Sequence, residues 1–307
     1  MSETYKSIVA NPGAVLDLGS TVQSAYLAMR RAFAVARFES PQTDARLLLQ
    51  GILHHTATDI ILGEGIPLSA DEAALLESAT RRRLNCEPVS RILGVRGFYG
   101  RDFLIGPDVL DPRPDTETVV DAVLELAHAS AVAPEDLRIA DIGVGSGAIL
   151  LSLMAELPKA KGVGTDFSAA AIKIARCNAE RLGVMSRVEL VQTDLLSGVD
   201  GPFHIIVSNP PYIPTGEITC LSKDVRDFDP LLALDGGGNG MEIYHKLASK
   251  ISELNFNGVV AVEVGAGQAD AVKALLVSAL GGVQKAEGRL WKDLGGHIRC
   301  VTVSRHS

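Results

Sequence analysis

Apolar positions in the first third of the chain recur at the spacing of a helix. From residue 22 to residue 33 they fall three and four residues apart, which predicts a helix with a single buried stripe. Ser40 before Pro41 predicts the start of a second helix, with serine as the cap and proline in the first helical position. Ser69 and Glu72 form a capping box that predicts a third. The first part of the chain is therefore expected to be a small helical unit.

From about residue 117 the pattern alternates between short apolar runs and amphipathic stretches. The strand-like runs lie at residues 138–142, 162–165, 188–192, 204–208, 259–264 and 298–304. A helix with a face of alanine and isoleucine is expected at 168–182. Repeated β-α units predict an α/β fold with a doubly wound, Rossmann-like parallel sheet and right-handed crossovers. Sheets of this kind bind ligands beyond the carboxyl ends of their strands.

Residues 89 to 110 show a third pattern, with short strand-like runs, glycine turns and aromatic side chains. This pattern predicts a β-hairpin that links two domains. The chain has 307 residues, which is enough for two domains at roughly 150 residues each. We therefore expect an N-terminal helical domain at residues 1–87, a β-hairpin linker at 88–112 and the sheet domain at 113–307. The ligand-binding motifs described below all lie in the sheet domain, so the helical domain is expected to recognise the substrate.

Composition and charge exclude several classes of protein. The chain is 47% apolar and 21% charged, which is typical of a globular protein with a sizeable core. Its net charge of −8 disfavours coating of nucleic acid, because affinity for phosphates comes largely from Lys and Arg. The four cysteines lie far apart and give no metal-ligand spacing, so no metal is expected. Met1–Ala14 lacks the features of a secretory signal, and no segment approaches the roughly 20 apolar residues of a membrane span. We expect a cytoplasmic protein.

A glycine-rich run follows the first strand of the sheet domain and opens a helix. It consists of Asp141, Ile142, Gly143, Val144 and Gly145. The glycines permit a tight turn and let a ligand approach the backbone at the positive end of a helix. Alone, this run also fits the dinucleotide fingerprint of a nicotinamide dehydrogenase.

Two further carboxylates end the next strands. Asp166 can accept hydrogen bonds from two ribose hydroxyls, although it could equally serve as a cap for the following helix. Asp194 ends a third strand, where a carboxylate can hold an adenine amino group. Together with Asp141, these strand ends outline a pocket for an adenosyl ligand.

The most specific chemistry lies directly after the strand at 204–208. The run there is Asn209, Pro210, Pro211 and Tyr212. Two consecutive prolines stiffen the loop and donate no backbone hydrogen bonds, so carbonyl groups and the Asn209 side-chain oxygen remain free to accept. Tyr212 offers a flat face for stacking. This arrangement suits a planar NH₂ group, such as a carboxamide or the amine of a nucleobase.

In their order along the chain these motifs resemble the HemK/PrmC family, the glutamine methyltransferases of translation release factors. The resemblance includes P-R-P-D-T-E at residues 112–117, D-P-L-L-A-L at 229–234, V-E-V-G at 262–265 and D-L-G-G at 293–296. It also reaches T-D-A-R-L-L-L at 43–49 and covers most of the chain. It implies a class I S-adenosylmethionine-dependent methyltransferase. Such an enzyme methylates the side-chain amide nitrogen of the glutamine in a Gly-Gly-Gln motif and leaves S-adenosylhomocysteine.

The resemblance also implies roles for particular residues. Asp141 and the turn at 143–145 would hold the methionine part of the cofactor, Asp166 the ribose, and Asp194 with Leu195 the adenine. At Leu195 the family usually has an aromatic residue, and at Asp229 it more often has glutamate.

On the substrate side, Asn209 and the Pro210 carbonyl would accept the two amide hydrogens of the glutamine, beside Pro211 and Tyr212. Phe98 and Arg113 would line the substrate entrance.

Several alternatives remain at this stage. A ribosomal-protein glutamine methyltransferase differs mainly in the segment at 112–117, and an adenine-N6 DNA methyltransferase would flip a base against Tyr212. A nicotinamide dehydrogenase leaves the run at 209–212 unexplained, and a non-catalytic binding protein could retain the same fold. The expected partners are release factors, with neither a membrane nor a specific nucleic acid sequence.

Overall fold

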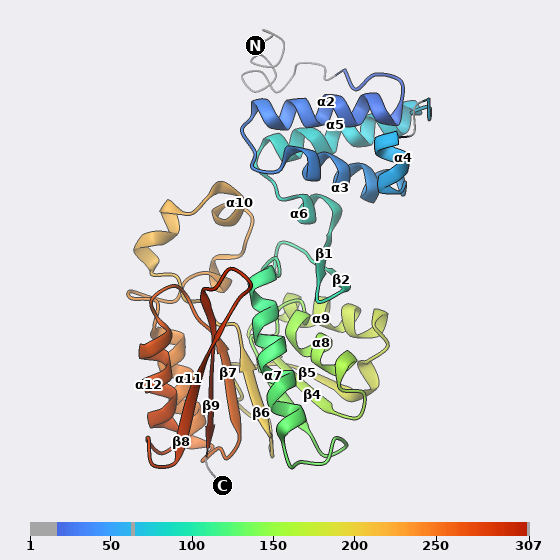
Figure 1. The fold of residues 1–307 in the computed structure, drawn as a ribbon. Coiled ribbons are helices and arrows are strands. Elements are labelled where there is room, and N and C mark those ends of the chain that lie inside the picture. Colours follow the sequence, from blue (N-terminus) through green and yellow to red (C-terminus); the bar gives the residue numbers. More distant parts are fainter. Residues whose placement is uncertain (1–16, 63–64, 306–307) are drawn as a thin grey trace. The chain divides into compact units, whose positions relative to one another are not determined.

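The structure is a computed structural model that describes residues 17–62 and 65–305. The chain divides into two compact units, Met1–Gly94 and Val95–Ser307 (Figure 1). The expectation about Met1–Ala14 falls outside the described residues. Within the described ranges, no helix is long and apolar enough to cross a membrane.

The first unit is helical, as the apolar spacing predicts. Its helices are α2 (Val22–Val35), α3 (Pro41–Leu53), α4 (Ala57–Leu62), α5 (Ala70–Leu84) and α6 (Val89–Leu93). The apolar stripe of α2 packs into a core with α3, α4 and α5, centred on fully buried side chains such as Met29, Phe33 and Leu48. Helix α6 occupies the beginning of the stretch for which short strands were expected.

Two helix starts show how far the capping signals hold. The capping box of Ser69 and Glu72 is formed at the start of α5, with each side chain accepting from the other residue's backbone N–H. The expected serine cap of α3 is wrong: the Ser40 side chain makes no capping bond, and only Pro41 fits the expectation. The arginines at 81–83 all make ion pairs inside this unit.

The second unit contains a mixed sheet. Its strands are β3 (Arg138–Ile142), β4 (Lys161–Asp166), β5 (Val188–Gln192), β6 (Ile205–Ser208), β7 (Val259–Glu263), β8 (Ala286–Lys292) and β9 (Ile298–Arg305). Within the described part of the chain their order is β5-β4-β3-β6-β7-β9-β8. The first five run parallel, whereas β9 is antiparallel to both β7 and β8. The expected doubly wound, parallel sheet is therefore confirmed, with one antiparallel edge formed by β9 and by β8, which was not foreseen.

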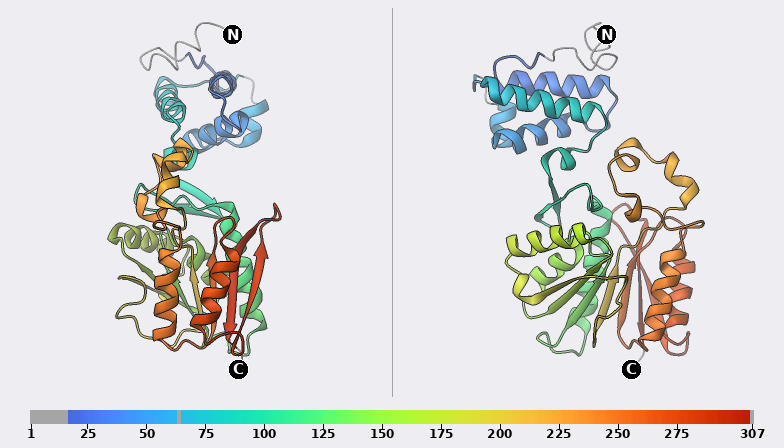
Figure 2. Two further views of the ribbon diagram at one scale, coloured as in Figure 1. Left: turned by 90° about the vertical axis from the view of Figure 1, so that its left-hand side faces the viewer. Right: turned by 180° about the vertical axis from the view of Figure 1, so that it is seen from behind.

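Helices cover both faces of this sheet (Figure 2). The longer ones are α7 (Glu117–Ala129), α8 (Ala148–Glu156), α9 (Ala169–Arg181), α11 (Glu242–Glu253) and α12 (Ala269–Ala279), and α10 (Lys223–Arg226) is one turn. Short 3₁₀ segments lie at Pro114–Thr116, Met185–Arg187, Thr215–Cys220 and Leu231–Ala233. Ile205 faces the core under α7, α8 and α9, whereas its neighbour Ile206 faces the core under α11 and α12. Because alternate side chains point to opposite faces, strands buried on both sides read as unbroken apolar runs.

A β-hairpin begins the second unit. It pairs β1 (Val95–Phe98) with β2 (Arg101–Leu104) through Tyr99 and Gly100, whose φ angles of 49° and 70° match a two-residue hairpin turn. Asn178 fixes the hairpin: its amide bonds both backbone groups of Leu104 and donates to the Ser146 carbonyl at 2.8 Å. The hairpin is thereby attached to the loop that follows β3.

Candidate active site

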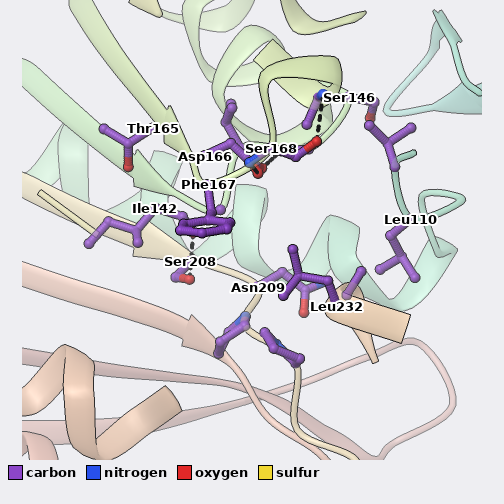
Figure 3. Close-up of a pocket in the computed structure, with 18 of the residues that line it drawn as sticks. Leu110, Ile142, Ser146, Thr165, Asp166, Phe167, Ser168, Ser208, Asn209 and Leu232 are labelled. Carbon is purple, nitrogen blue, oxygen red and sulfur yellow. Dashed lines mark hydrogen bonds between the residues drawn. The ribbon is translucent and has the colours of Figure 1, made fainter. Parts of the chain in front are cut away.

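A cavity of about 560 Å³ opens at the carboxyl ends of β3 to β6 (Figure 3). This volume lies within the range of small-molecule sites. Ten of the residues singled out in the sequence line it: Ile142, Gly143, Val144, Gly145, Asp166, Asp194, Leu195, Asn209, Pro210 and Pro211. Asp141, Tyr212, Phe98 and Arg113 are not among its lining residues.

The glycine turn forms one wall of the cavity. The N–H groups of Gly143 and Val144 both donate to the Thr165 carbonyl at 2.8 Å, which ties the turn to β4. Gly143 has a φ of 75°, and a side chain added there would meet nothing within 4 Å, so the turn leaves open space for a ligand. Gly147 begins α8 with a φ of 85°, where an added Cβ would come within 2.6 Å of Leu151.

Asp166 connects this turn to the start of α9. Its Oδ2 accepts from Gly145 N–H at 2.9 Å and its Oδ1 accepts from Ser168 N–H at 2.8 Å. The cap itself is Ser168, whose hydroxyl accepts from Ala171 N–H. A carboxylate oxygen has lone pairs for more than one donor, so Asp166 is able to accept from hydroxyl groups while it holds the turn.

Asp141 lies beneath the turn instead of in the cavity. Its carboxyl is 1% exposed, and Oδ2 accepts from Leu150 N–H at 3.2 Å. Its Oδ1 has no hydrogen-bond partner among the described residues. Burial, together with the charge of Asp166, raises the pKa of Asp141 to about 7.

Phe167 is a site residue that the sequence analysis missed. It follows Asp166, lines the cavity and is 67% exposed. Figure 3 shows its ring between Asp166 and Ser208, with Asn209 farther along the cavity. Its position directly after the strand-end aspartate was the available signal. Leu195, on the same cavity, has a φ of 52°, a strained conformation for a branched residue.

The Asn-Pro-Pro-Tyr loop follows β6 across the cavity from Phe167. Ser208 donates its hydroxyl to the Ile142 carbonyl at 2.7 Å, which joins β6 to β3 directly before the loop. Asn209 donates its Nδ2 to Thr116 Oγ1 at 3.3 Å. The Tyr212 ring lies outside the lining residues, and its hydroxyl donates to Glu263 Oε1 at 3.4 Å.

Close backbone packing holds the end of this loop. Gln268 donates to the Tyr212 carbonyl at 3.0 Å, and Ile213 exchanges backbone hydrogen bonds with residues 234 and 236. A Cβ added at Gly240 would come within 2.2 Å of the Tyr212 carbonyl oxygen. Segments far apart in sequence therefore fix the loop's position.

Neither of the two residues expected at the substrate entrance lines the cavity. Phe98 is 2% exposed and packs edge-on against Phe103 at 6.1 Å between ring centroids, so its expected place at the entrance is wrong. The Arg113 guanidinium pairs with the buried carboxylate of Asp229, which also accepts from Asp111 N–H at 3.2 Å. Arg113 thus joins the segment before α7 to the segment after α10.

The cavity fits an adenosyl cofactor. Open space above Gly143, the Asp166 carboxylate and the exposed face of Phe167 offer a backbone approach, an acceptor for hydroxyls and a stacking surface. No cluster of three or more potential metal-ligating side chains occurs in the described ranges.

The mixed sheet and its cavity define a class I methyltransferase. Residues 120–222 match the methyltransferase small domain. The fold is similar to the catalytic domain of METTL16 in complex with the MAT2A 3′UTR hairpin 6, at a TM-score of 0.53 and 16% identity over 78% of this chain and 84% of that one.

Sequence comparison gives the family. Residues 25–94 match the PrmC N-terminal domain. A release factor glutamine methyltransferase from Bradyrhizobium diazoefficiens is 44% identical over 94% of this chain and 96% of its own length. One from Rhodospirillum rubrum is 43% identical over 89% of this chain and 82% of its own length. The chain belongs to this family, as the motifs predict, and is an S-adenosylmethionine-dependent enzyme.

Proposed function

We propose that this protein transfers a methyl group from S-adenosylmethionine to the side-chain amide nitrogen of the glutamine in the Gly-Gly-Gln motif of a translation release factor, in the cytoplasm. The observation that carries this proposal is the position of Asn209 and Pro210 on the same cavity as the glycine turn. An acceptor pair for an NH₂ group and a fitting cofactor pocket thus meet in one place. The names of the curated relatives support the choice of substrate.

On the cofactor side, the turn at 142–145 would hold the methionine part and Asp166 the ribose hydroxyls. Asp194, Leu195 and Phe167 would surround the adenine, with the Phe167 ring in place of the aromatic residue that the family usually has at Leu195. Asp141 would act from below, by holding the N-terminus of α8 through Leu150 N–H.

When bound, the cofactor supplies an electrophilic methyl group on a sulfonium. An amide nitrogen is a poor nucleophile, because its lone pair is delocalised into the carbonyl. Asn209 Oδ1 and the Pro210 carbonyl would accept the two amide hydrogens and aim the nitrogen at the methyl. They would also favour pyramidalisation as positive charge develops on the nitrogen. Alignment for in-line displacement supplies much of the remaining acceleration.

No strong base is needed at the acceptor nitrogen, since it can lose a proton after the methyl arrives. Tyr212 is a poor candidate for a base, because burial and the nearby Glu263 carboxyl raise the pKa of its phenol. We assign Tyr212 to fixing the loop and expect it to remain protonated at neutral pH.

The test is mass spectrometry of purified release factor after incubation with the enzyme and labelled S-adenosylmethionine. One added methyl on the glutamine of the Gly-Gly-Gln peptide is the expected result. Label on a ribosomal protein or on adenine in DNA, with none on the release factor, would contradict the proposal.

The variant Asn209→Ala tests the acceptor role. It should bind S-adenosylmethionine normally by calorimetry and lose about 10²–10³ in turnover, because it removes a hydrogen bond felt mainly in the transition state. Asn257→Ala, an exposed position two residues before β7 that does not line the cavity, serves as the matched control. Near-normal turnover of Asn209→Ala would refute the assigned role.

A further inference from the structure

A group of polar side chains lies behind the Asn-Pro-Pro-Tyr loop and has no role in the mechanism so far. Thr116 precedes α7, and Glu263 ends β7; both are buried, at 4% and 2% exposure. They belong to the two motifs at 112–117 and 262–265, of which only Pro112 and Thr116 line the cavity. Burial of a carboxyl costs folding free energy unless neighbouring groups donate hydrogen bonds to it or pair with its charge.

Contacts from the loop converge on this pair. Asn209 Nδ2 donates to Thr116 Oγ1 at 3.3 Å, and the Tyr212 hydroxyl donates to Glu263 Oε1 at 3.4 Å. Oε2 of Glu263 is buried and has no hydrogen-bond partner among the described residues, and the nearby Thr116 hydroxyl lowers the pKa of this carboxyl. Thr116 stands at the cap position of α7, yet its side chain makes no capping bond there. Its hydroxyl is therefore available to the loop and the carboxyl.

The direction of these hydrogen bonds determines which end of the Asn209 amide faces the cavity. A hydroxyl carries one hydrogen, and a carboxylate can only accept it. If Glu263 takes the hydrogen of Thr116, the Thr116 oxygen can accept from Nδ2 of Asn209. Without the Glu263 carboxyl, the Thr116 hydroxyl can donate to Oδ1 of Asn209. The Asn209 amide would then turn its NH₂ group toward the substrate.

We propose that Glu263 is a positioning residue for methyl transfer. By taking the hydrogen of the Thr116 hydroxyl, it orients Asn209 so that Oδ1 faces the acceptor amide. This inference rests on the proposed function, because it assigns the support for the acceptor pair described above. Glu263 also accepts from the Tyr212 hydroxyl, and this contact fixes the other end of the same loop.

The charge on Glu263 is not essential to this role. Burial raises its pKa to about 7, against the opposing influences of the Thr116 and Tyr212 hydroxyls and of Arg299, and Asp115 raises it further. Tyr244 and Cys300 also pack close to this carboxyl. In either protonation state one oxygen remains able to accept, so glutamine should replace Glu263 where leucine cannot.

The experiment compares turnover and cofactor affinity in paired variants. Glu263→Leu and Thr116→Val should each lower kcat about 10- to 100-fold, because small misplacements of reacting groups are costly. Glu263→Gln and Thr116→Ser should stay within about threefold of the unchanged enzyme. The dissociation constant for S-adenosylmethionine should change less than about twofold in all four. Because both residues act through the same series of hydrogen bonds, the double variant Glu263→Leu/Thr116→Val should be no slower than the slower single variant.

Thr302→Val is the matched control. Thr302 is buried on β9, accepts from Trp291 Nε1 at 2.8 Å and lies outside the cavity. The control should lose stability without losing kcat. Unchanged kcat in Thr116→Val, or effects that multiply in the double variant, would overturn the proposal.

A second readout does not depend on the substrate. In ¹⁵N-labelled protein, the Asn209 side-chain resonances should shift in Glu263→Leu and Thr116→Val and remain in place in Thr302→Val. Unaltered Asn209 resonances in both variants would refute the positioning role. If the unchanged enzyme fails to methylate a release factor, the proposed function is wrong, and these resonances still decide whether Glu263 orients Asn209.

Discussion

At the scale of single residues, the exposed ring of Phe167 is the feature of the cavity that most clearly indicates a ligand-binding role. A large aromatic side chain that is 67% exposed contributes little to the folded core. Phe167→Ala should therefore weaken S-adenosylmethionine binding by about 1–2 kcal/mol, the usual scale for stacking plus buried area, and leave the melting temperature nearly unchanged. Calorimetric titration measures the first effect and thermal unfolding the second.

The control for Phe167→Ala is Leu231→Ala, because Leu231 is 60% exposed and does not line the cavity. Equal cofactor affinity in both variants would show that the Phe167 ring does not contact the adenine.

Asp141 gives a prediction about pH. Its pKa is about 7 in the folded protein and 3.8 in the reference state. As the pH rises from about 4 to 7, the unfolded chain releases this proton while the folded protein retains it. The stability contributed by Asp141 is therefore present below pH 4, is lost toward pH 7, and then stays constant.

Asp141→Asn keeps an acceptor for Leu150 N–H but removes this titration. Its stability relative to the unchanged protein should rise between pH 4 and pH 8, by at most about 4 kcal/mol. Urea unfolding at a series of pH values measures the difference. Asp136→Asn, at an exposed position, is the control, and a difference that does not vary with pH would contradict the prediction.

At the scale of elements, one ion pair joins two segments that border the cavity. Arg113 precedes the 3₁₀ turn before α7, and its partner Asp229 lies between α10 and the turn at Leu231–Ala233. The carboxylate side chain is 1% exposed and the guanidinium 32%. Removing the cation should therefore cost more than a surface pair would, although solvent reduces the loss on the arginine side.

Arg113→Met should accordingly lower the free energy of unfolding by about 1–3 kcal/mol. Arg113→Met/Asp229→Leu should lose less than the sum of the two single variants, because the second change removes the carboxylate left without its ion pair. Denaturant unfolding of the four proteins measures the coupling. A coupling of zero would mean that the pair does not connect the two segments energetically.

Elements buried on both faces could be predicted from the sequence nearly to the residue. Strands β6 and β7 lie at 205–208 and 259–263, within one residue of the expected 204–208 and 259–264, because each is buried on both faces and reads as a nearly continuous apolar run. Strand β8 could not be predicted in the same way. It is an edge strand with charged residues among its apolar ones, and its antiparallel pairing with β9 is a long-range contact that local pattern does not encode.

The same distinction between local sequence pattern and long-range contacts applies to the candidate site. Residues in strand-end turns line the cavity as expected, because the parallel topology brings those turns together. Phe98 was misplaced because the sequence of a short hairpin does not say which face is buried. The direction of the Tyr212 ring depends on Glu263, a partner 51 residues away.

At the scale of the whole molecule, the cavity belongs to one unit alone. Its lining residues fall between Asp108 and Lys246, and the first unit has its own helical core. The boundary lies at Gly94, because Leu93 packs against Gly51 and keeps α6 with the first unit. A fragment beginning at Val95 therefore tests the separate role of the first unit better than one beginning at Pro88, the expected start of the linker.

We predict that the fragment Val95–Ser307 binds S-adenosylmethionine within about threefold of the full chain. It should methylate an intact release factor at least about tenfold less efficiently, through a higher apparent KM, since the first unit would supply protein–protein contact distant from the reacting groups. A short Gly-Gly-Gln peptide cannot reach such a surface and should be an equally weak substrate for both forms. A cooperative melting transition of the fragment must be shown first. If the folded fragment methylates the whole release factor as well as the full chain does, the helical unit is not a recognition domain, and substrate selection lies within the cavity-bearing unit itself.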